Sequence, residues 1–234
     1  MPRSDWRQNR YLFHVHTCYT DGHLIVADYI DFALTAGVDS VVFLEHIRRD
    51  PRYDVERFAA EVKQSGSEAV KTVLGFEAKL LPDGTLDIND DCIERAAVIG
   101  IAEHGFPHDR NLLRDAFLNV VRTYPLRWPD ITFVWAHPGL WYLKHHLVAE
   151  QDDAFDEMLA AACASGILLE QNLRYGLLSP TTAEKLPAPS LILGADAHSL
   201  SDLERWGRLH AVNSSHDPSE RVALPAAVPV GNLV

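Results

Sequence analysis

The sequence predicts an α/β barrel, and three observations lead to that fold class. Apolar runs rich in Val, Ile, Leu and Phe recur at intervals of about 30 residues along the 234-residue chain, which is the length of a βαβ unit. Each run is apolar throughout, as expected for parallel strands that are buried on both faces. Amphipathic stretches lie between most of the runs. Because strand and helix alternate about seven times, the sheet is expected to close into a barrel rather than stay open.

The order of the elements follows from these two patterns. Strands are expected within residues 11–16, 41–46, 73–77, 98–104, 131–137, 166–172 and 191–198. Helices are expected over residues 26–36, 55–64, 110–122, 154–164, 181–185 and 201–209. Gly37 would end the first helix as its C-cap, and the turn signal at 82–85 predicts a small hairpin after the third strand. We expect one barrel domain over residues 1–216 and an extended tail over 217–234, which is rich in Ala, Val and Pro.

The composition limits the class of protein. The chain is 47% hydrophobic and 23% charged, which is typical of a globular domain. No apolar run approaches the ~18 residues of a membrane span, and the first residues lack the apolar core of a signal peptide. Cys18, Cys92 and Cys163 are too few and too far apart for a disulfide framework. We therefore expect a cytoplasmic protein without a membrane segment. Its net charge of −12 argues against a nucleic-acid partner.

Residues that can bind metal ions stand at or just past the ends of six of the strands. They are His14, His16, His46, Glu77, His104, His137, Asp196 and His198, and Asp21 or His23 in the loop after the first strand could supply a ninth. Because parallel strands end at the same edge of a sheet, one site would collect all of them. Residues two apart in a strand point the same way, so both imidazoles of His14-Val15-His16 could reach one ion. A single motif of this kind is often two ordinary histidines, but six strands that end this way favour a metal centre.

The donor atoms indicate which metal ions would bind. Imidazole nitrogen and carboxylate oxygen together suit zinc, manganese or iron rather than calcium or magnesium. Nine ligands exceed the needs of one tetrahedral ion and suffice for two to three divalent ions, with Glu77 as a bridge. Three such ions would bring six positive charges, and Glu77, Asp196 and one further carboxylate would return three. A strongly positive site within an acidic protein favours phosphate binding.

These motifs resemble those of the polymerase and histidinol phosphatase (PHP) family of metal-dependent phosphoesterases. The matching segments are Phe13-His14-Val15-His16-Thr17 with Asp21-Gly22, Glu45-His46, Gly75-Phe76-Glu77, His104, His137-Pro138-Gly139 and Gly194-Ala195-Asp196-Ala197-His198. They follow one another in the family's order and cover nearly the whole chain. The resemblance implies a distorted (β/α)7 barrel with a metal site, typically of three ions, at the C-terminal ends of the strands. The family's usual Thr-Asp-His is Leu44-Glu45-His46 here, and no polymerase module is attached.

Carried over to this chain, the resemblance implies three sets of ligands. The first ion would bind His14, His16, Glu77 and Asp196, the second Glu77, His104 and His137, and the third His46, His198 and either Asp21 or His23. Glu77, Asp196 and His198 are the candidate catalytic residues. His198 or His23 could also protonate the leaving group.

Three arginines are candidates for phosphate binding, because a guanidinium can bind phosphate through two parallel hydrogen bonds. Arg48 and Arg49 follow His46, and Arg174 follows the sixth strand. The whole pattern predicts a metal-dependent hydrolase of small phosphomonoesters. A phosphodiesterase or nuclease, a non-catalytic metal-binding module, and a different metal hydrolase on a related barrel are the alternatives. The last of these is disfavoured because Lys79 is poorly placed as a carboxylated ligand.

Overall fold

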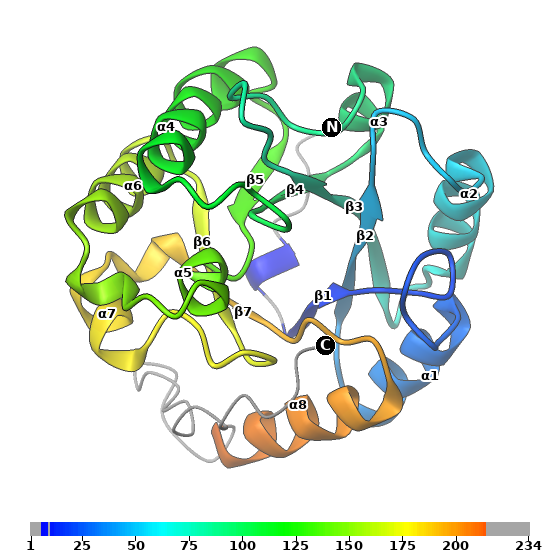
Figure 1. The fold of residues 1–234 in the computed structure, drawn as a ribbon. Helices are drawn as coiled ribbons and strands as arrows, with labels where there is room; N and C mark the ends of the chain where they lie inside the picture. The colour runs from blue at the N-terminus through cyan, green and yellow to red at the C-terminus, as the bar shows by residue number, and fades with distance from the viewer. Residues whose placement is uncertain (1–5, 9, 214–234) are drawn as a thin grey trace.

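Seven parallel strands form one sheet, and helices surround it (Figure 1). The structure, a computed structural model, describes residues 6–8 and 10–213. The strands are β1 (Tyr11–Val15), β2 (Ser40–Ile47), β3 (Lys71–Lys79), β4 (Val98–Ala102), β5 (Thr132–Trp135), β6 (Leu168–Asn172) and β7 (Leu191–Gly194), and each pairs with the next in sequence order. The predicted (β/α)7 barrel is therefore confirmed. The expected domain boundary at residue 216 and the tail lie outside the described residues.

Helices form the outer layer of the barrel. The helices are α1 (Val26–Ala36), α2 (Val55–Ser65), α3 (Asp90–Arg95), α4 (Arg110–Arg127), α5 (Leu140–Lys144), α6 (Asp153–Ala164), α7 (Pro180–Lys185) and α8 (Leu200–Asn213), with short 3-10 helices at Trp6–Gln8, Ala149–Gln151 and Ala188–Ser190. Of these, α5 lies inside the ring of the others in Figure 1. All six predicted helices are present. Gly37 ends α1 in the left-handed conformation, with φ of 66°, as a C-cap glycine does.

Two helices were not predicted from the sequence. The short helix α3 begins at Asn89, whose side chain accepts a hydrogen bond from the backbone N–H of Cys92. The helix α5 begins at Gly139 and contains Leu-Trp-Tyr-Leu-Lys, which has no polar face. Because neither spans two full turns of amphipathic pattern, hydrophobic periodicity gives no signal for them.

Backbone hydrogen bonds between the two ends of the chain close the barrel. Ala195 N–H donates to Phe13 O at 2.9 Å, and Ala197 N–H donates to His14 O at 3.0 Å. His16 N–H donates to Ala197 O at 2.9 Å. These bonds continue the sheet past the end of β7 and join it to β1. As a result, two segments that lie about 180 residues apart in the chain come side by side at the mouth of the barrel.

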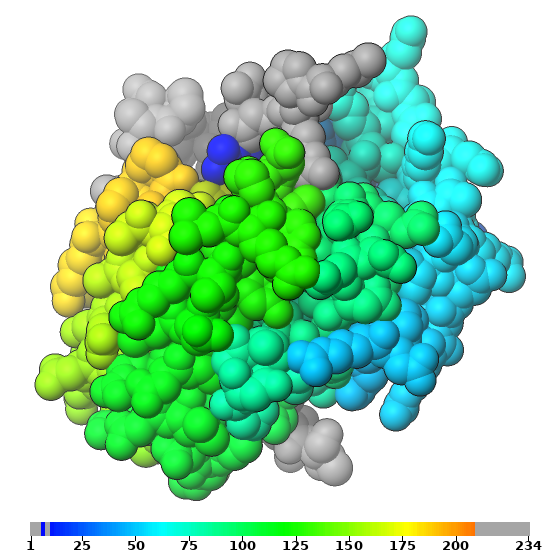
Figure 2. All heavy atoms as spheres, turned by 90° about the horizontal axis from the view of Figure 1, so that it is seen from above, coloured from blue at the N-terminus to red at the C-terminus, as the bar shows by residue number. Residues whose placement is uncertain are grey.

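Each strand buries side chains on both of its faces. On β1 and β2, Leu12 and Val41 belong to the layer between sheet and helices, while Phe13 and Val42 belong to the interior of the barrel. The ring of Trp6 stacks on Phe13 with ring centroids 5.5 Å apart. Viewed from another side, α4, in green, forms part of the continuous outer surface (Figure 2). Among the described residues, no helix is long and apolar enough to cross a membrane.

Two glycines make room for the side chain of Leu44 inside the barrel. A Cβ atom at Gly75 would lie 3.0 Å from Leu44 Cδ1, and one at Gly100 would lie 2.7 Å from Leu44 Cδ2. Leu44 is fully buried. It therefore fills the interior directly below the level at which polar side chains begin.

Leu44→Ala should lower the free energy of unfolding by about 2–5 kcal/mol, because it leaves a cavity in a rigid barrel. Equilibrium unfolding in urea measures the change. The matched control is Leu34→Ala on α1, where the leucine is 53% exposed and the expected change is within about 0.5 kcal/mol. Equal losses in the two variants would contradict the packing described here.

Candidate metal centre

Along the strands, the side chains that face the interior of the barrel change from apolar residues to the predicted metal ligands. On β2, Leu44 belongs to the barrel interior, and His46 follows at the next position on that side because side chains alternate along a strand. The register of the sheet pairs His46 with Glu77 on β3, and Glu77 with Gly100 on β4. His104 follows beyond the end of β4. The polar layer of the barrel therefore lies one step above its apolar layer.

Three predicted ligands have a left-handed backbone. The φ angles are 67° at His14, 38° at His137 and 49° at Asp196, a region that residues other than glycine rarely adopt. At His14 the pairing of β1 with β2 shifts by a bulge, and His16 lies past the end of β1. Simple alternation along a strand, the reason that the sequence suggested for these two histidines, is therefore wrong. Both imidazoles nevertheless reach the same place, with ring centroids 4.9 Å apart, and strain of this kind is typical of functional sites.

Glu77 lies at the centre of the cluster and is 1% exposed. One carboxylate oxygen, Oε1, lies 2.7 Å from His137 Nε2 and 3.4 Å from His104 Nε2. The other, Oε2, lies 2.8 Å from His46 Nδ1. Two further nitrogens lie 3.8 Å from this carboxylate: His14 Nε2 and His16 Nε2. A single carboxylate thus faces five imidazoles, which is the position of a bridging ligand.

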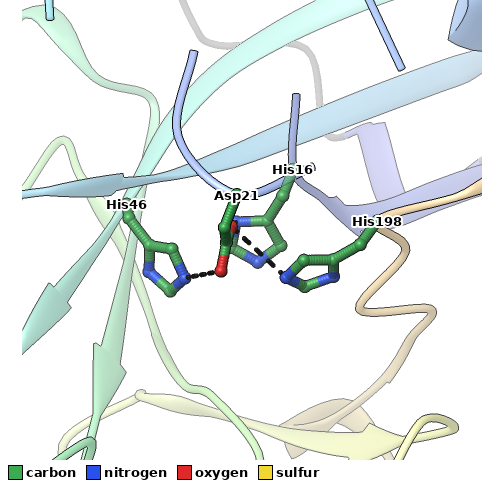
Figure 3. Close-up of side chains that lie close together, drawn as sticks. All are labelled: His16, Asp21, His46 and His198. Carbon is green, nitrogen blue, oxygen red and sulfur yellow. Dashed lines mark ion pairs between the residues drawn. The ribbon is translucent and has the colours of Figure 1, made fainter. Parts of the chain in front are cut away.

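Asp21 lies among His16, His46 and His198 (Figure 3), and its side chain is 54% exposed. Its carboxylate oxygens lie 3.3 Å from His46 Nε2 and 3.4 Å from His198 Nε2, and one of them lies 4.0 Å from His16 Nδ1. These four residues form a group that could hold one ion. His23 belongs to none of the candidate groups found among the described residues. The structure thus brings Asp21, rather than His23, to the cluster.

Several of the distances between ligand atoms suit a shared ion better than direct hydrogen bonds. Two donors on one tetrahedral zinc ion lie about 3.3 Å apart, given Zn–N and Zn–O bonds of about 2.0–2.1 Å. The contacts of Asp21 have this spacing, and His16 Nε2 lies 3.6 Å from Asp196 Oδ1. The contacts of Glu77 with His46 and His137 are shorter, at 2.8 and 2.7 Å. Those pairs would have to separate by about 0.6 Å to share an ion.

Several nitrogens of the cluster are buried without a hydrogen-bond partner. They are His14 Nε2, both ring nitrogens of His16, and His137 Nδ1. A buried polar atom without a partner is costly, and native proteins pair nearly all of them. His14 and His16 form a candidate ion-binding group with Asp196, whereas His137 belongs to none of the candidate groups found among the described residues. The donor set therefore fits divalent metal ions.

Glu170 orients two of these groups from below. Its Oε1 lies 2.7 Å from His14 Nδ1, so His14 directs Nε2 toward the cluster. Its Oε2 accepts the backbone N–H of His137 at 2.6 Å. Carboxylates that hold a histidine in this way fix its tautomer and make it a better ligand. The two contacts give Glu170 this role in the cluster.

Two other buried carboxylates hold the loops that carry ligands. Glu45 accepts the backbone N–H of Thr17 at 2.8 Å and also accepts the hydroxyls of Thr17 and Thr20. The longer side chain at this departure from the family motif thus fixes the first loop. Glu103 accepts from Trp135 Nε1 at 2.7 Å and from Trp141 N at 2.9 Å. Sequence reasoning overlooked Glu103, although it directly precedes His104.

Charge in the cluster is distributed between cationic imidazoles and ionised carboxylates. Burial lowers the pKa of His14, but Glu170 and Asp196 outweigh burial and raise it to about 9. Burial also opposes the charge on His46, yet Glu77 and Asp21 raise its pKa to about 10. Burial raises the pKa of Glu77, but the neighbouring histidines hold it well below its usual range. The carboxylates thus carry full charge, and protons on His14 and His46 stand where metal ions would otherwise provide positive charge.

The local charge differs from the value that the sequence suggested. Glu45, Glu103 and Glu170 are buried beside the predicted ligands, and the earlier sum of three returned negative charges omitted them. Burial raises the pKa of Glu103 to about 7, so this group carries only part of a charge near neutral pH. Burial raises the pKa of Glu45 as well. Three bound ions would therefore leave a smaller positive excess than the sequence suggested.

Comparison with known proteins identifies the family. A family model described as PHP domain matches residues 13–172. The chain belongs to the PHP domain family. Together with the cluster of imidazoles and carboxylates, this membership makes the protein a metal-dependent hydrolase of the phosphatase type. No curated protein sequence matches the chain.

Solved structures share the fold of this PHP domain. The putative histidinol phosphatase from Listeria monocytogenes matches with a TM-score of 0.61 and 15% identity, over 84% of this chain and 98% of that chain. Histidinol phosphate phosphatase from Lactococcus lactis subsp. lactis Il1403, complexed with zinc, L-histidinol and phosphate, matches with a TM-score of 0.57 and 14% identity, over 85% and 91% of the two chains. At these identities the likeness concerns the fold.

The three predicted phosphate-binding arginines of the PHP domain lie in different places. Arg174 reaches the cluster, with Nη1 2.6 Å from His198 Nδ1 and 3.2 Å from Asp196 O. Arg48 lines the cleft beside the cluster. Arg49 does not line this cleft; its guanidinium donates to Thr85 Oγ1 and Leu86 O. Arg49 thus binds the 82–85 turn and not the cleft.

Gly194→Ala should weaken metal binding, because a Cβ atom at this position would overlap the carboxylate of Glu170. Glu170 could then no longer orient His14. We expect about a 10–100-fold loss of zinc affinity, the usual effect of removing such a partner. Competition with a chromogenic chelator measures the loss.

Gly207→Ala on α8 is the matched control, because its Cβ would meet only Phe32 Cζ at 3.8 Å. Glu170→Gln tests the same contact without a steric clash. Wild-type zinc affinity in both Gly194→Ala and Glu170→Gln would refute the role of Glu170.

Zinc binding should release protons and strengthen as the pH rises. His14 and His46 have raised pKa values of about 9 and about 10, so both hold a proton at pH 7 that a metal ion must displace. Calorimetry in two buffers of different ionisation enthalpy counts the protons. Glu170→Gln should release about one proton fewer, because it removes the largest contribution that raises the pKa of His14. Affinity that stays constant between pH 6.5 and 8.5 would contradict this distribution of charge.

Proposed function

We propose that the protein hydrolyses small phosphomonoesters at a centre of three divalent metal ions. One ion would bind His14, His16, Glu77 and Asp196, a second Glu77, His104 and His137, and a third Asp21, His46 and His198. The observation that carries this proposal is the burial, without hydrogen-bond partners, of His14 Nε2 and His16 Nε2, which both face the carboxylates of Glu77 and Asp196. A mixed set of nitrogen and oxygen donors suits zinc, manganese or iron.

The groups of ligand atoms in the structure support several ions but divide the residues differently. The three groups overlap: His16 belongs to two of them, and so does His46. One group joins His14, His16 and Asp196, and another joins His46, Glu77 and His104. Overlap of this kind is expected where a bridging carboxylate and shared imidazoles lie between closely spaced ions. The assignment of each ligand to one ion remains part of the proposal.

The residues around the centre would bind and orient the substrate phosphate. When bound, the ions would polarise the phosphorus centre and lower the pKa of an attacking water. Arg174 could add two parallel hydrogen bonds to phosphate oxygens. Its present contact with His198 Nδ1 conflicts with ligation, because Nε2 can bind a metal ion only when Nδ1 carries the proton. In that tautomer Nδ1 would donate to Asp196 O, now 3.0 Å away, and Arg174 would turn toward the phosphate.

The leaving group would take its proton from water. His198 Nε2 faces Asp21 at 3.4 Å, so metal ligation and proton donation would compete for the same atom. His23 is exposed, and its imidazole belongs to none of the candidate groups found among the described residues. We therefore assign His198 to metal binding and neither histidine to acid catalysis. Glu77 and Asp196 would act by positioning the ions.

The alternatives have less support. A histidinol phosphate phosphatase with this fold contains zinc, L-histidinol and phosphate, which favours a small phosphate ester and zinc for this chain as well. The net charge of −12 counts against a nuclease. A non-catalytic module would be expected to have lost ligands, yet a candidate residue stands at each of the nine positions. A cytoplasmic location, in which Cys18, Cys92 and Cys163 stay reduced, remains a prediction.

Asp196→Ala and His14→Ala should each lose most phosphatase activity, at least about 100-fold, together with bound metal, while the protein stays folded. Phosphate release from a panel of monoesters, metal content and circular dichroism measure the three properties. His108→Ala is the control. The ring of His108 stacks on that of His145, with centroids 4.0 Å apart, and His108 belongs to none of the candidate groups found among the described residues. Activity near wild type in both variants would refute the mechanism.

A further inference from the structure

A cleft of about 620 Å³ opens beside the proposed metal centre. Three of its lining residues are predicted ligands, namely Asp21, His46 and His104. Its volume is that of a small-molecule site rather than of a phosphate ion alone. The other residues that line the cleft therefore indicate what kind of molecule carries the phosphate.

Four of the other lining side chains are cationic: Arg48, Arg52, Lys79 and Lys144. Two of them follow from the register of the barrel. His46 pairs with Glu77. Two residues further along the chain are Lys79, the last residue of β3, and Arg48, which directly follows the end of β2. Side chains two residues apart share a face and lie about 7 Å from one another. A layer of positive charge thus follows the layer of metal ligands toward solvent.

These cations have few negative partners. Asp21, a predicted metal ligand, is the one acidic residue that lines the cleft among the described residues. Arg48 lies 3.7 Å from Asp87. Within the part of the chain that the structure describes, Arg52, Lys79 and Lys144 form no ion pair within 4.0 Å. Gathering four like charges is unfavourable, and it is unexpected in a protein with a net charge of −12. An anionic ligand would compensate for it.

Two tyrosines add an apolar wall to the same cleft. Tyr19 and Tyr53 line it, with ring centroids 5.8 Å apart in an edge-to-face arrangement. Tyr19 is fixed by its hydroxyl, which donates to Glu61 Oε2 at 2.7 Å. Rigid aromatic rings of this kind pack against the carbon skeleton of a ligand. The cleft thus combines an apolar side with positive charge beyond the metal centre.

We propose that the preferred substrates are phosphomonoesters that carry a second anionic group, a carboxylate or another phosphate. The scissile phosphate would bind at the metal centre, and the second group would bind among Arg48, Arg52, Lys79 and Lys144. This inference rests on the proposed phosphatase activity. A longer polyanion, such as single-stranded DNA, could use the same charges, but the acidic surface disfavours it.

Paired substrates that differ by one anionic group test the proposal. Glycerol 2-phosphate and 2-phosphoglycerate differ by a carboxylate, and fructose 6-phosphate and fructose 1,6-bisphosphate differ by a phosphate. We expect kcat/KM to be at least about tenfold higher for the more anionic member of at least one pair, since a charge-assisted hydrogen bond contributes about that factor. Which pair shows the larger ratio distinguishes carboxylate from phosphate. The ratio should fall as the salt concentration rises.

Substitutions in the cleft should reduce this ratio. Arg52→Gln combined with Lys144→Gln should lower it about tenfold, and Lys144→Arg, which keeps the charge, should preserve it. Arg122→Gln on α4 combined with Lys185→Gln on α7 is the matched control, because both residues are exposed and neither lines the cleft. This control should change neither the ratio nor the activity.

The outcomes separate the two proposals. Hydrolysis of both members of each pair at equal kcat/KM would reject the second anionic group and leave the phosphatase activity standing. Faster cleavage of a single-stranded oligonucleotide than of any monoester would also overturn the inference. No phosphate release from any compound by zinc-loaded protein would reject the proposed function itself.

Discussion

Five imidazoles surround the buried carboxylate of Glu77, and the rest of the structure is arranged so that this contact can exist. An ionised carboxylate without partners would not be stable in the interior of a barrel. Here its charge is balanced by neighbours on four other segments of the chain, so the register of the sheet and the closure of the barrel both become conditions for its burial. Burial raises the pKa of Glu77, but His46 and His104 outweigh burial and hold it well below its usual range. A metal ion would compete with the proton on His46, whose pKa is raised to about 10, which couples metal binding to protonation.

The residues that close the barrel are the residues that form the site. The backbone of His14 and His16 bonds to that of Ala197, while the side chains of the two histidines point toward Asp196. This double use explains why the backbone is strained at His14 and Asp196, where φ is 67° and 49°. A regular strand could form the backbone hydrogen bonds that close the barrel, but it would direct the side chains elsewhere. Glu170 supports the arrangement from β6, and it can do so only because residue 194 has no side chain.

The sequence predicted the fold and the ligand cluster because both depend on short-range patterns. Apolar runs identify strands, and polar residues at their ends must meet in any parallel barrel. What could not be predicted depends on contacts between distant segments. The bulge at His14 is a property of strand pairing, and the short helix α5 has no periodicity to detect. Arg49 looked equivalent to Arg48, but its partners Thr85 and Leu86 lie 36 and 37 residues away. Nothing in the local sequence distinguishes these two arginines.

The net charge of the chain describes its surface and not its site. The sequence predicted a strongly positive site, made so by three metal ions, within a protein of net charge −12. The buried Glu45, Glu103 and Glu170 reduce that excess, whereas the cleft contributes cations of its own. Phosphate chemistry and substrate selection would then lie in separate layers of one barrel, the first set by buried ligands and the second by side chains nearer to solvent. Because the outer layer lies on loops, on the end of β3 and on the short helix α5, it could change without disturbing the inner one, which is how one barrel can serve many substrates.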